Sequence, residues 1–150
     1  MPTPFSGGCA CGAIRYDCAA EPILALNCHC RDCQRASGSA YASVVVEPTP
    51  ALTLRKGQPK YHAVKADSGH TSRRGFCTEC GSPVLVTIDE SPELMAIQVA
   101  SLDDPSWHRP TMEFFASSAQ PWDHMNPALR KFAKEPTEEQ LREVLGARGE

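Results

Sequence analysis

Seven of the eight cysteines in this 150-residue chain fall into three short clusters, and thiols grouped in this way can bind a metal ion. The clusters are Cys9 with Cys11, Cys77 with Cys80, and Cys28 with Cys30 and Cys33. Cys18 stands apart from all three. The number and spacing of the cysteines differ between the clusters. The two pairs are typical of a structural metal site, whereas the triplet is typical of a reactive one.

The two cysteine pairs have the features of a structural zinc site. Residues 77–81 form a Cys-x-x-Cys-Gly turn, which aims both thiolates inward while backbone N–H groups donate to sulfur. Phe76 is an apolar neighbour that would shield such a site. One turn supplies only two of the four ligands of a tetrahedral structural zinc. Cys9 and Cys11, which precede Gly12, are the natural second pair.

The triplet supplies three thiolates within six residues and leaves a fourth zinc position open. An open position distinguishes a reactive zinc from a closed structural one. Cys18 or His29 could instead close the tetrahedron, although His29 lies between two ligands, where its side chain would tend to point away. Disulfides are a third alternative, which a reducing compartment and the poor geometry of Cys-x-Cys bridges disfavour.

Short β-strands must position these clusters, because 13 prolines and 10 glycines spread through the chain divide it into brief segments. The segments rich in β-branched or aromatic residues are 13–17, 23–27, 40–46, 52–55, 60–64, 82–87, 94–100 and 111–116. They predict a mainly β domain with antiparallel strands.

Two helices are expected beside these strands. One is a short turn of helix at 31–37, which overlaps the triplet. The other follows Thr137, which forms a capping box with Gln140, and it ends at Gly146. Its apolar face comprises Leu141, Val144 and Leu145.

Length and composition limit the class of protein. A chain with 41% hydrophobic and 22% charged residues is expected to fold as one domain. The longest apolar runs are about four residues, and the N-terminus lacks the features of a signal peptide. The net charge of −3 disfavours nucleic-acid binding. We therefore expect a cytoplasmic protein with neither a membrane nor a nucleic-acid partner, and homo-oligomerisation stays open.

Three segments resemble the glutathione-dependent formaldehyde-activating enzyme (GFA) family and the related domain of centromere protein V. They are residues 6–16, 28–39 and 74–83, which carry the three cysteine clusters and their flanks in the family's order. Residues 119–122, Ala-Gln-Pro-Trp, resemble the family's Ala-Pro-Trp segment. The resemblance implies a β-tent fold of twisted antiparallel sheets with zinc-ribbon-like clusters. It also implies a GFA-like zinc-binding domain at 1–125, with 126–150 as a C-terminal helical extension of the same domain.

The resemblance further implies two zinc sites and a carbon–sulfur lyase. The structural ligands are Cys9, Cys11, Cys77 and Cys80, and the catalytic ligands are Cys28, Cys30 and Cys33. In the family's reaction, the sulfur of glutathione occupies the open zinc position and attacks formaldehyde, giving S-hydroxymethylglutathione. The triplet suits this chemistry, because three thiolates leave Zn²⁺ with a net charge of about −1, and such a site favours a further thiol over hydroxide. The expected partners are a small thiol and an aldehyde.

Glutathione would need anchors for two carboxylates and an amine. Arginines near the triplet and backbone N–H groups at the turn 37–39 could provide them. The candidate contacts are Arg31, Arg35, Ser37 and Gly38, with Arg73 and Arg74 as further candidates.

Two other functions remain open at this stage. One is a zinc-stabilised binding module without catalytic activity, which a basic tail would favour. Instead, the C-terminal segment carries Glu135, Glu138, Glu139 and Glu143. The other is a redox sensor that uses the triplet as a thiol and zinc switch.

Overall fold

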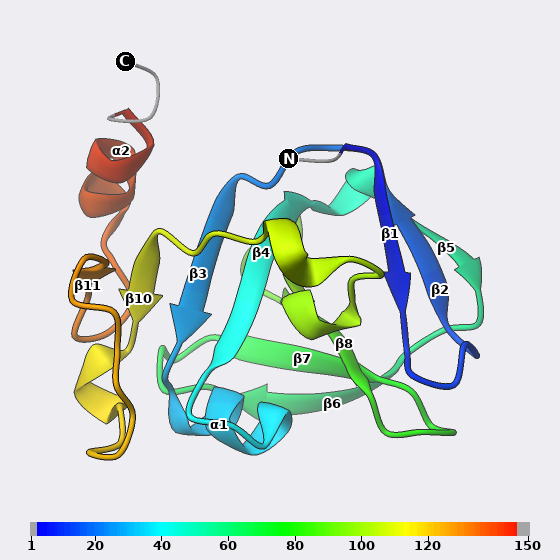
Figure 1. The fold of residues 1–150 in the computed structure, drawn as a ribbon, viewed down its shortest axis with the longest axis horizontal. Coiled ribbons are helices and arrows are strands. Elements are labelled where there is room, and N and C mark those ends of the chain that lie inside the picture. The colour runs from blue at the N-terminus through cyan, green and yellow to red at the C-terminus, as the bar shows by residue number, and fades with distance from the viewer. Residues whose placement is uncertain (1–2, 147–150) are drawn as a thin grey trace.

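The structure, a computed structural model, describes residues 3–146 and is mainly β, with two twisted sheets (Figure 1). The smaller sheet has the order β1 (Phe5–Gly8), β2 (Arg15–Cys18), β5 (Leu52–Lys56). The larger has the order β11 (Arg130–Lys131), β10 (Met112–Phe114), β3 (Leu24–Cys28), β4 (Ala42–Pro48), β9 (Leu94–Gln98), β8 (Pro83–Ile88), β7 (Thr71–Phe76), β6 (Lys60–Lys65). The helices are α1 (Arg31–Ser37) and α2 (Glu138–Gly146), and the 3₁₀ turns are η1 (Thr49–Ala51), η2 (Val99–Ser101), η3 (Pro105–Trp107) and η4 (Ala116–Ser118).

The predicted mainly β fold is confirmed, and each predicted strand overlaps an observed one. Strands β1, β7 and β11 were not predicted, because β1 ends in two glycines and β7 reads Thr-Ser-Arg-Arg-Gly-Phe without apolar alternation. Pairing with neighbouring strands supplies their backbone hydrogen bonds. The expectation of antiparallel sheets holds for seven of the strand pairings, whereas β10 runs parallel to both β3 and β11.

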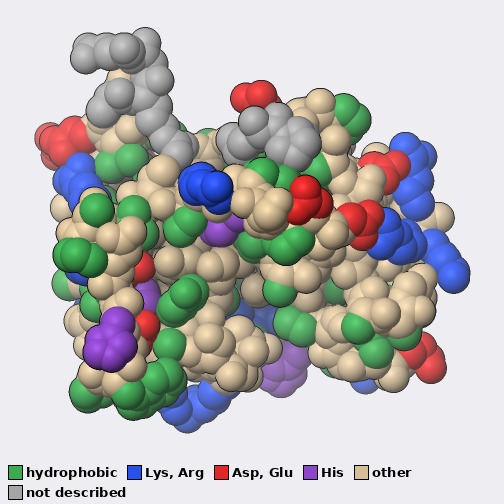
Figure 2. Space-filling model, in the orientation of Figure 1, with side chains coloured by type: hydrophobic (Ala, Val, Ile, Leu, Met, Phe, Trp, Pro, Cys, Tyr) green, Lys and Arg blue, Asp and Glu red, His purple; other side chains and the backbone are tan. Residues whose placement is uncertain are grey.

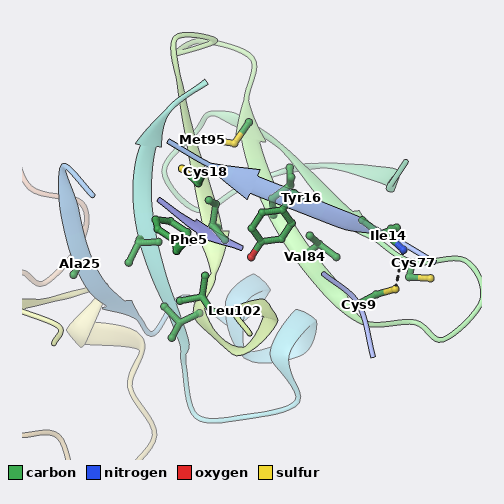
Figure 3. Packing of buried hydrophobic residues seen from close by; sticks show 14 residues of the cluster. Phe5, Cys9, Ile14, Tyr16, Cys18, Ala25, Cys77, Val84, Met95 and Leu102 are labelled. Atoms are coloured by element: carbon green, nitrogen blue, oxygen red, sulfur yellow. Dashed lines mark hydrogen bonds between the residues drawn. The ribbon is translucent and has the colours of Figure 1, made fainter. Parts of the chain in front are cut away.

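The main hydrophobic core lies between the two sheets. Cross-strand register places Ala25, Val45 and Ile97 in one row across β3, β4 and β9, and side chains from β1 and β2 pack against this face. Tyr16 is fully buried at the centre of the cluster, where its hydroxyl lies 2.7 Å from the Oγ of Ser101 (Figure 3). This face of the large sheet is therefore used for stability and leaves the opposite face to form a second cluster.

The second cluster covers the opposite face of the large sheet and joins α1 to the C-terminal segment. Phe132 is buried in it, and Leu141 and Val144 of α2 pack against it. Leu145, the third predicted face residue, is 38% exposed. The predicted capping box is present, because Thr137 N–H donates to the Oε1 of Gln140 at 2.9 Å and Gln140 N–H donates to the Oγ1 of Thr137 at 3.2 Å. Within residues 3–146, neither helix combines the length and the apolar character needed to cross a membrane.

Charged side chains of both signs are interspersed on the face seen in Figure 2. Several form exposed ion pairs around the small sheet. The Arg15 Nη2 lies 2.5 Å from the Oδ2 of Asp103, and the Arg55 Nε lies 2.7 Å from the Oδ2 of Asp17. Exposed pairs of this kind contribute about 0–1 kcal/mol each, so the fold depends mainly on its hydrophobic core.

Glu47 of β4 is a buried carboxylate, and neither of its oxygens has a hydrogen-bond partner among residues 3–146. Burial raises the pKa of Glu47 to about 7, and the neighbouring Cys18 thiol offsets only part of this effect. The ordinary pKa is 4.5, so the folded chain retains a proton that the unfolded chain releases. The free energy of unfolding therefore falls as the pH rises from about 4.5 to about 7.

The variant Glu47→Gln has no ionisable group at this position and therefore lacks this loss of stability at higher pH. Its stability advantage over the parent should grow by about 1–3 kcal/mol between pH 5 and pH 8. Denaturant unfolding of both proteins at the two pH values, in excess zinc, measures the difference. The exposed Glu21→Gln is the control and should show no such growth. An advantage of Glu47→Gln that is equal at both pH values would contradict the assignment.

Candidate metal centres and the adjoining cavity

Two loops far apart in the sequence bring the cysteine pairs together. Cys9 and Cys11 lie between β1 and β2, whereas Cys77 and Cys80 lie between β7 and β8. The four sulfur atoms lie within 4.8 Å of one another. Each turn closes through a glycine with positive φ, Gly12 at 79° and Gly81 at 75°, a conformation that most other residues avoid.

The geometry of these four thiols fits a tetrahedral zinc ion. A Zn–S bond of about 2.3 Å requires sulfur atoms about 3.8 Å apart. The observed separations are 3.6 Å between Cys9 and Cys11 and 3.8 Å between Cys11 and Cys77. Backbone N–H groups point at the sulfurs, with Ile14 donating to Cys9 at 3.2 Å (Figure 3) and Glu79 donating to Cys77 at 3.4 Å. Such donors stabilise thiolates.

Ser82 links the two loops of this first centre. Its hydroxyl oxygen accepts a hydrogen bond from the Ala10 N–H at 3.1 Å and lies 3.1 Å from the Cys80 sulfur. The hydrogen bond from Ser82 is the largest cause of a pKa of about 5 for Cys80. This lowering of the pKa favours the thiolate, the form of cysteine that binds metal.

The triplet forms a second, separate group of sulfurs, also within 4.8 Å of one another. Cys28 ends β3, Cys30 is the N-cap of α1, and the Cys33 N–H donates to the Cys30 sulfur at 3.3 Å. The pKa of Cys33 is lowered to about 3, first by hydrogen bonds from the Cys28 and Cys30 thiols and then by the Arg74 guanidinium. The Arg74 Nη2 lies 3.6 Å from the Cys33 sulfur. The group can hold a metal ion through three sulfurs.

Neither alternative fourth ligand lies with the triplet. His29 is fully buried and points away from the sulfurs, with its Nε2 3.1 Å from the Oε2 of Glu113 and its Nδ1 3.0 Å from the Oδ2 of Asp123. Cys18 is buried in the main core. Among residues 3–146, no group of potential metal ligands contains either side chain. All eight cysteines are free, so the disulfide alternative also finds no support.

A buried polar network holds the chain between Cys28 and Cys30. Glu113 accepts from the Asn27 amide at 3.2 Å as well as contacting His29, and the Ser43 hydroxyl donates to Asn27 at 2.6 Å. This network cannot be recognised from sequence spacing, because Glu113 lies 84 residues from His29. The only local signal was an acidic residue inside the apolar strand Met112–Phe114.

A cavity of about 170 Å³ adjoins the triplet on the face of the large sheet opposite the main core. All three cysteines line it, together with Arg74 and mainly aliphatic side chains. The Nε and Nη1 of Arg74 are buried, and neither has a hydrogen-bond partner among the described residues. Buried N–H donors without partners are costly, so this guanidinium is suited to an oxygen or anionic group that enters the cavity.

The four predicted thiol contacts lie elsewhere. Arg31, Arg35 and Gly38 line a separate depression of about 470 Å³ together with Trp122. The Ser37 hydroxyl donates to the Cys33 carbonyl within α1 at 2.7 Å. None of the four lines the cavity beside the triplet.

Of the two further candidates, Arg73 and Arg74, only one lies at the triplet, because neighbouring residues of β7 point to opposite faces of the sheet. Arg74 lines the cavity. Arg73 is exposed and its Nε donates to the Oδ1 of Asp89 at 2.7 Å. Strand alternation therefore leaves Arg74 as the cationic side chain at the triplet.

Comparison with known proteins places this architecture in context. The sequence profile of the family "Glutathione-dependent formaldehyde-activating enzyme" matches residues 4–118. A Penicillium rubens protein, provisionally named a glutathione-dependent formaldehyde-activating enzyme, is 29% identical over 128 residues. That match covers 77% of this chain and 66% of the fungal protein, just under two thirds of its length. The crystal structure of a Rhodobacter sphaeroides protein shares the fold, with a TM-score of 0.51 and 24% identity over 65% of this chain and 87% of that one.

Proposed function

Because this chain belongs to the glutathione-dependent formaldehyde-activating enzyme family, we propose that it is a zinc-dependent carbon–sulfur lyase. Its reaction joins a small thiol, glutathione or a similar molecule, to an aldehyde and also breaks the adduct. A cytoplasmic location is part of the proposal, because eight free cysteines and a thiol substrate suit a reducing compartment.

Two zinc ions are proposed, one at each group of sulfurs. The structural ligands are Cys9, Cys11, Cys77 and Cys80, and the catalytic ligands are Cys28, Cys30 and Cys33. At the structural site, sulfur separations of 3.6 and 3.8 Å and the Ile14 N–H donor to Cys9 support zinc. At the triplet, the Cys33 N–H donates to the Cys30 sulfur in the same way. When bound at the triplet, zinc supplies a soft Lewis acid that keeps a thiol deprotonated near neutral pH.

Arg74 is proposed to act on the aldehyde oxygen. As sulfur bonds to the carbonyl carbon, the C=O π electrons move onto oxygen, and the proton lost by the thiol ends on that oxygen. Negative charge therefore develops on oxygen in the transition state. The Nε and Nη1 of Arg74 are buried donors without partners among the described residues, next to Cys33 in the same cavity. Donors placed in advance where charge develops lower the barrier.

The observation that carries the proposal is this pairing of three clustered sulfurs with an unpartnered guanidinium in one cavity. A thiol switch would gain nothing from buried, unsatisfied donors, whereas a lyase can use them where negative charge develops on oxygen. Reversal of the same steps breaks the carbon–sulfur bond and returns the proton to the thiol.

The variant Arg74→Met tests the proposal. Methionine is similar in length to the aliphatic stem of arginine but lacks the guanidinium N–H donors. NMR exchange of formaldehyde with glutathione should show kcat/KM reduced by about 10²–10³. The matched control is Arg73→Met on the same strand, which breaks only an exposed ion pair and should change kcat/KM less than about twofold. Exchange no faster than the uncatalysed reaction in the zinc-loaded parent, both with formaldehyde and with a longer aldehyde such as hexanal, would refute the lyase and favour a binding module.

A further inference from the structure

The cavity beside the triplet is large and apolar for formaldehyde, and we propose that the aldehyde substrate carries an apolar group of about six carbon atoms. This inference rests on the proposed function and specifies its substrate class. The cavity measures about 170 Å³, whereas a molecule the size of water occupies about 30 Å³ in the liquid. A protein cavity of about 150 Å³ lined by aliphatic side chains can hold benzene. Formaldehyde, with two non-hydrogen atoms, would leave most of this space empty.

The register of the large sheet builds an aliphatic floor for the cavity. Val46 of β4 pairs with Ala96 of β9, and Ala96 pairs with Val86 of β8, so the three side chains form a row on one face. Leu26 and Val44 pair in the same way across β3 and β4. All five line the cavity. An apolar ligand group placed on this floor gains affinity by leaving water, at about fourfold per buried methylene.

The distribution of charge favours the aldehyde over glutathione as the occupant. Arg74 is the cationic side chain in the lining, and Asp67 and Glu135 are the acidic ones. Glutathione carries two carboxylates, and Arg74 could pair with only one of them, which would leave the other unpaired in a lining that also holds Asp67 and Glu135. An aldehyde has one polar end, which can meet Arg74 at the triplet, and an apolar remainder that can extend over the floor.

Segments next to both edge strands of the large sheet also line the cavity. The turn after β6 contributes Asp67 and Ser68, and the segment after β11 contributes Glu135. The His70 Nδ1 lies 3.9 Å from the Oε2 of Glu135, so segments next to the two edge strands of the eight-stranded sheet meet here. The lining of the cavity therefore extends from one edge of the large sheet to the other.

The experiment compares hexanal with formaldehyde, each with glutathione, and uses 1-hexanol as an unreactive binding probe. For each aldehyde, the acceleration over the uncatalysed reaction is measured by NMR. Binding of 1-hexanol is measured through the methyl resonances of the cavity valines and isoleucine.

The variant Ala96→Leu adds three carbon atoms to the centre of the floor, and Ala63→Leu makes the same change at an exposed position of β6 in the same sheet. Thermal unfolding checks that each variant is folded, and Ala96→Val is the smaller replacement if Ala96→Leu does not fold.

The proposal predicts at least about tenfold greater acceleration with hexanal than with formaldehyde. Ala96→Leu should weaken 1-hexanol binding and hexanal turnover by about tenfold or more, with formaldehyde turnover and the Ala63→Leu control near parental values. Acceleration with formaldehyde but not hexanal, without 1-hexanol binding, would overturn this inference and leave the proposed function standing. Acceleration with neither aldehyde would overturn the proposed function, and the inference with it.

Discussion

Replacing Cys77 with serine should remove one zinc ion per chain and leave the protein insoluble or partly unfolded. Cys77 is buried, and its sulfur lies 3.8 Å from that of Cys11, so the proposed zinc ties the β1–β2 loop to the β7–β8 loop. Structural zinc contributes on the order of 10 kcal/mol in small zinc modules, and a domain is stable by about 5–15 kcal/mol in total. Circular dichroism melting and native mass spectrometry together measure the fold and the zinc count.

Cys18→Ser is the matched control for this prediction. Cys18 is also fully buried in the main core, but it belongs to neither group of sulfurs. The control should keep both zinc ions and lose about 1–3 kcal/mol, the cost of a buried hydroxyl without a good partner. If Cys77→Ser melted like the parent and carried full zinc, the structural assignment would be wrong.

Cys30→Ser should abolish thiol–aldehyde exchange while the chain stays folded with one zinc ion. Cys30 is the N-cap of α1, where its sulfur accepts the Cys33 N–H at 3.3 Å. Serine is among the best N-cap residues, so the helix should survive while the site loses a thiolate. A site with three protein ligands also binds metal less tightly than a closed one.

Graded chelation of the parent provides a second measurement at the triplet. One zinc ion should leave first, with loss of activity and without unfolding, as followed by native mass spectrometry and circular dichroism. Full activity of Cys30→Ser, or joint loss of both metals with unfolding, would contradict the assignment. Cys18→Ser again serves as the control, because it changes a cysteine outside both groups of sulfurs.

The sequence by itself determined the family, the mainly β class and the local elements. Helix α1 has the predicted bounds of 31–37, and Thr137 and Gln140 form the predicted capping box. These features depend on residues a few positions apart, whose geometry is set by the backbone between them. Alternating apolar residues likewise predicted most of the strands. Gly-rich β1 and Arg-containing β7 lack this alternation and were not predicted.

Only the tertiary structure decided which charged side chains meet the triplet. Arg31 and Arg35 lie close to the cysteines in sequence but line another depression, whereas Arg74 approaches Cys33 from a strand 41 residues away. The carboxylates of Glu113 and Asp123 reach His29 across a still longer gap, which is 84 residues for Glu113. Such contacts depend on strand order and on register, since a shift of one residue in β7 would turn Arg74 to the other face of the sheet.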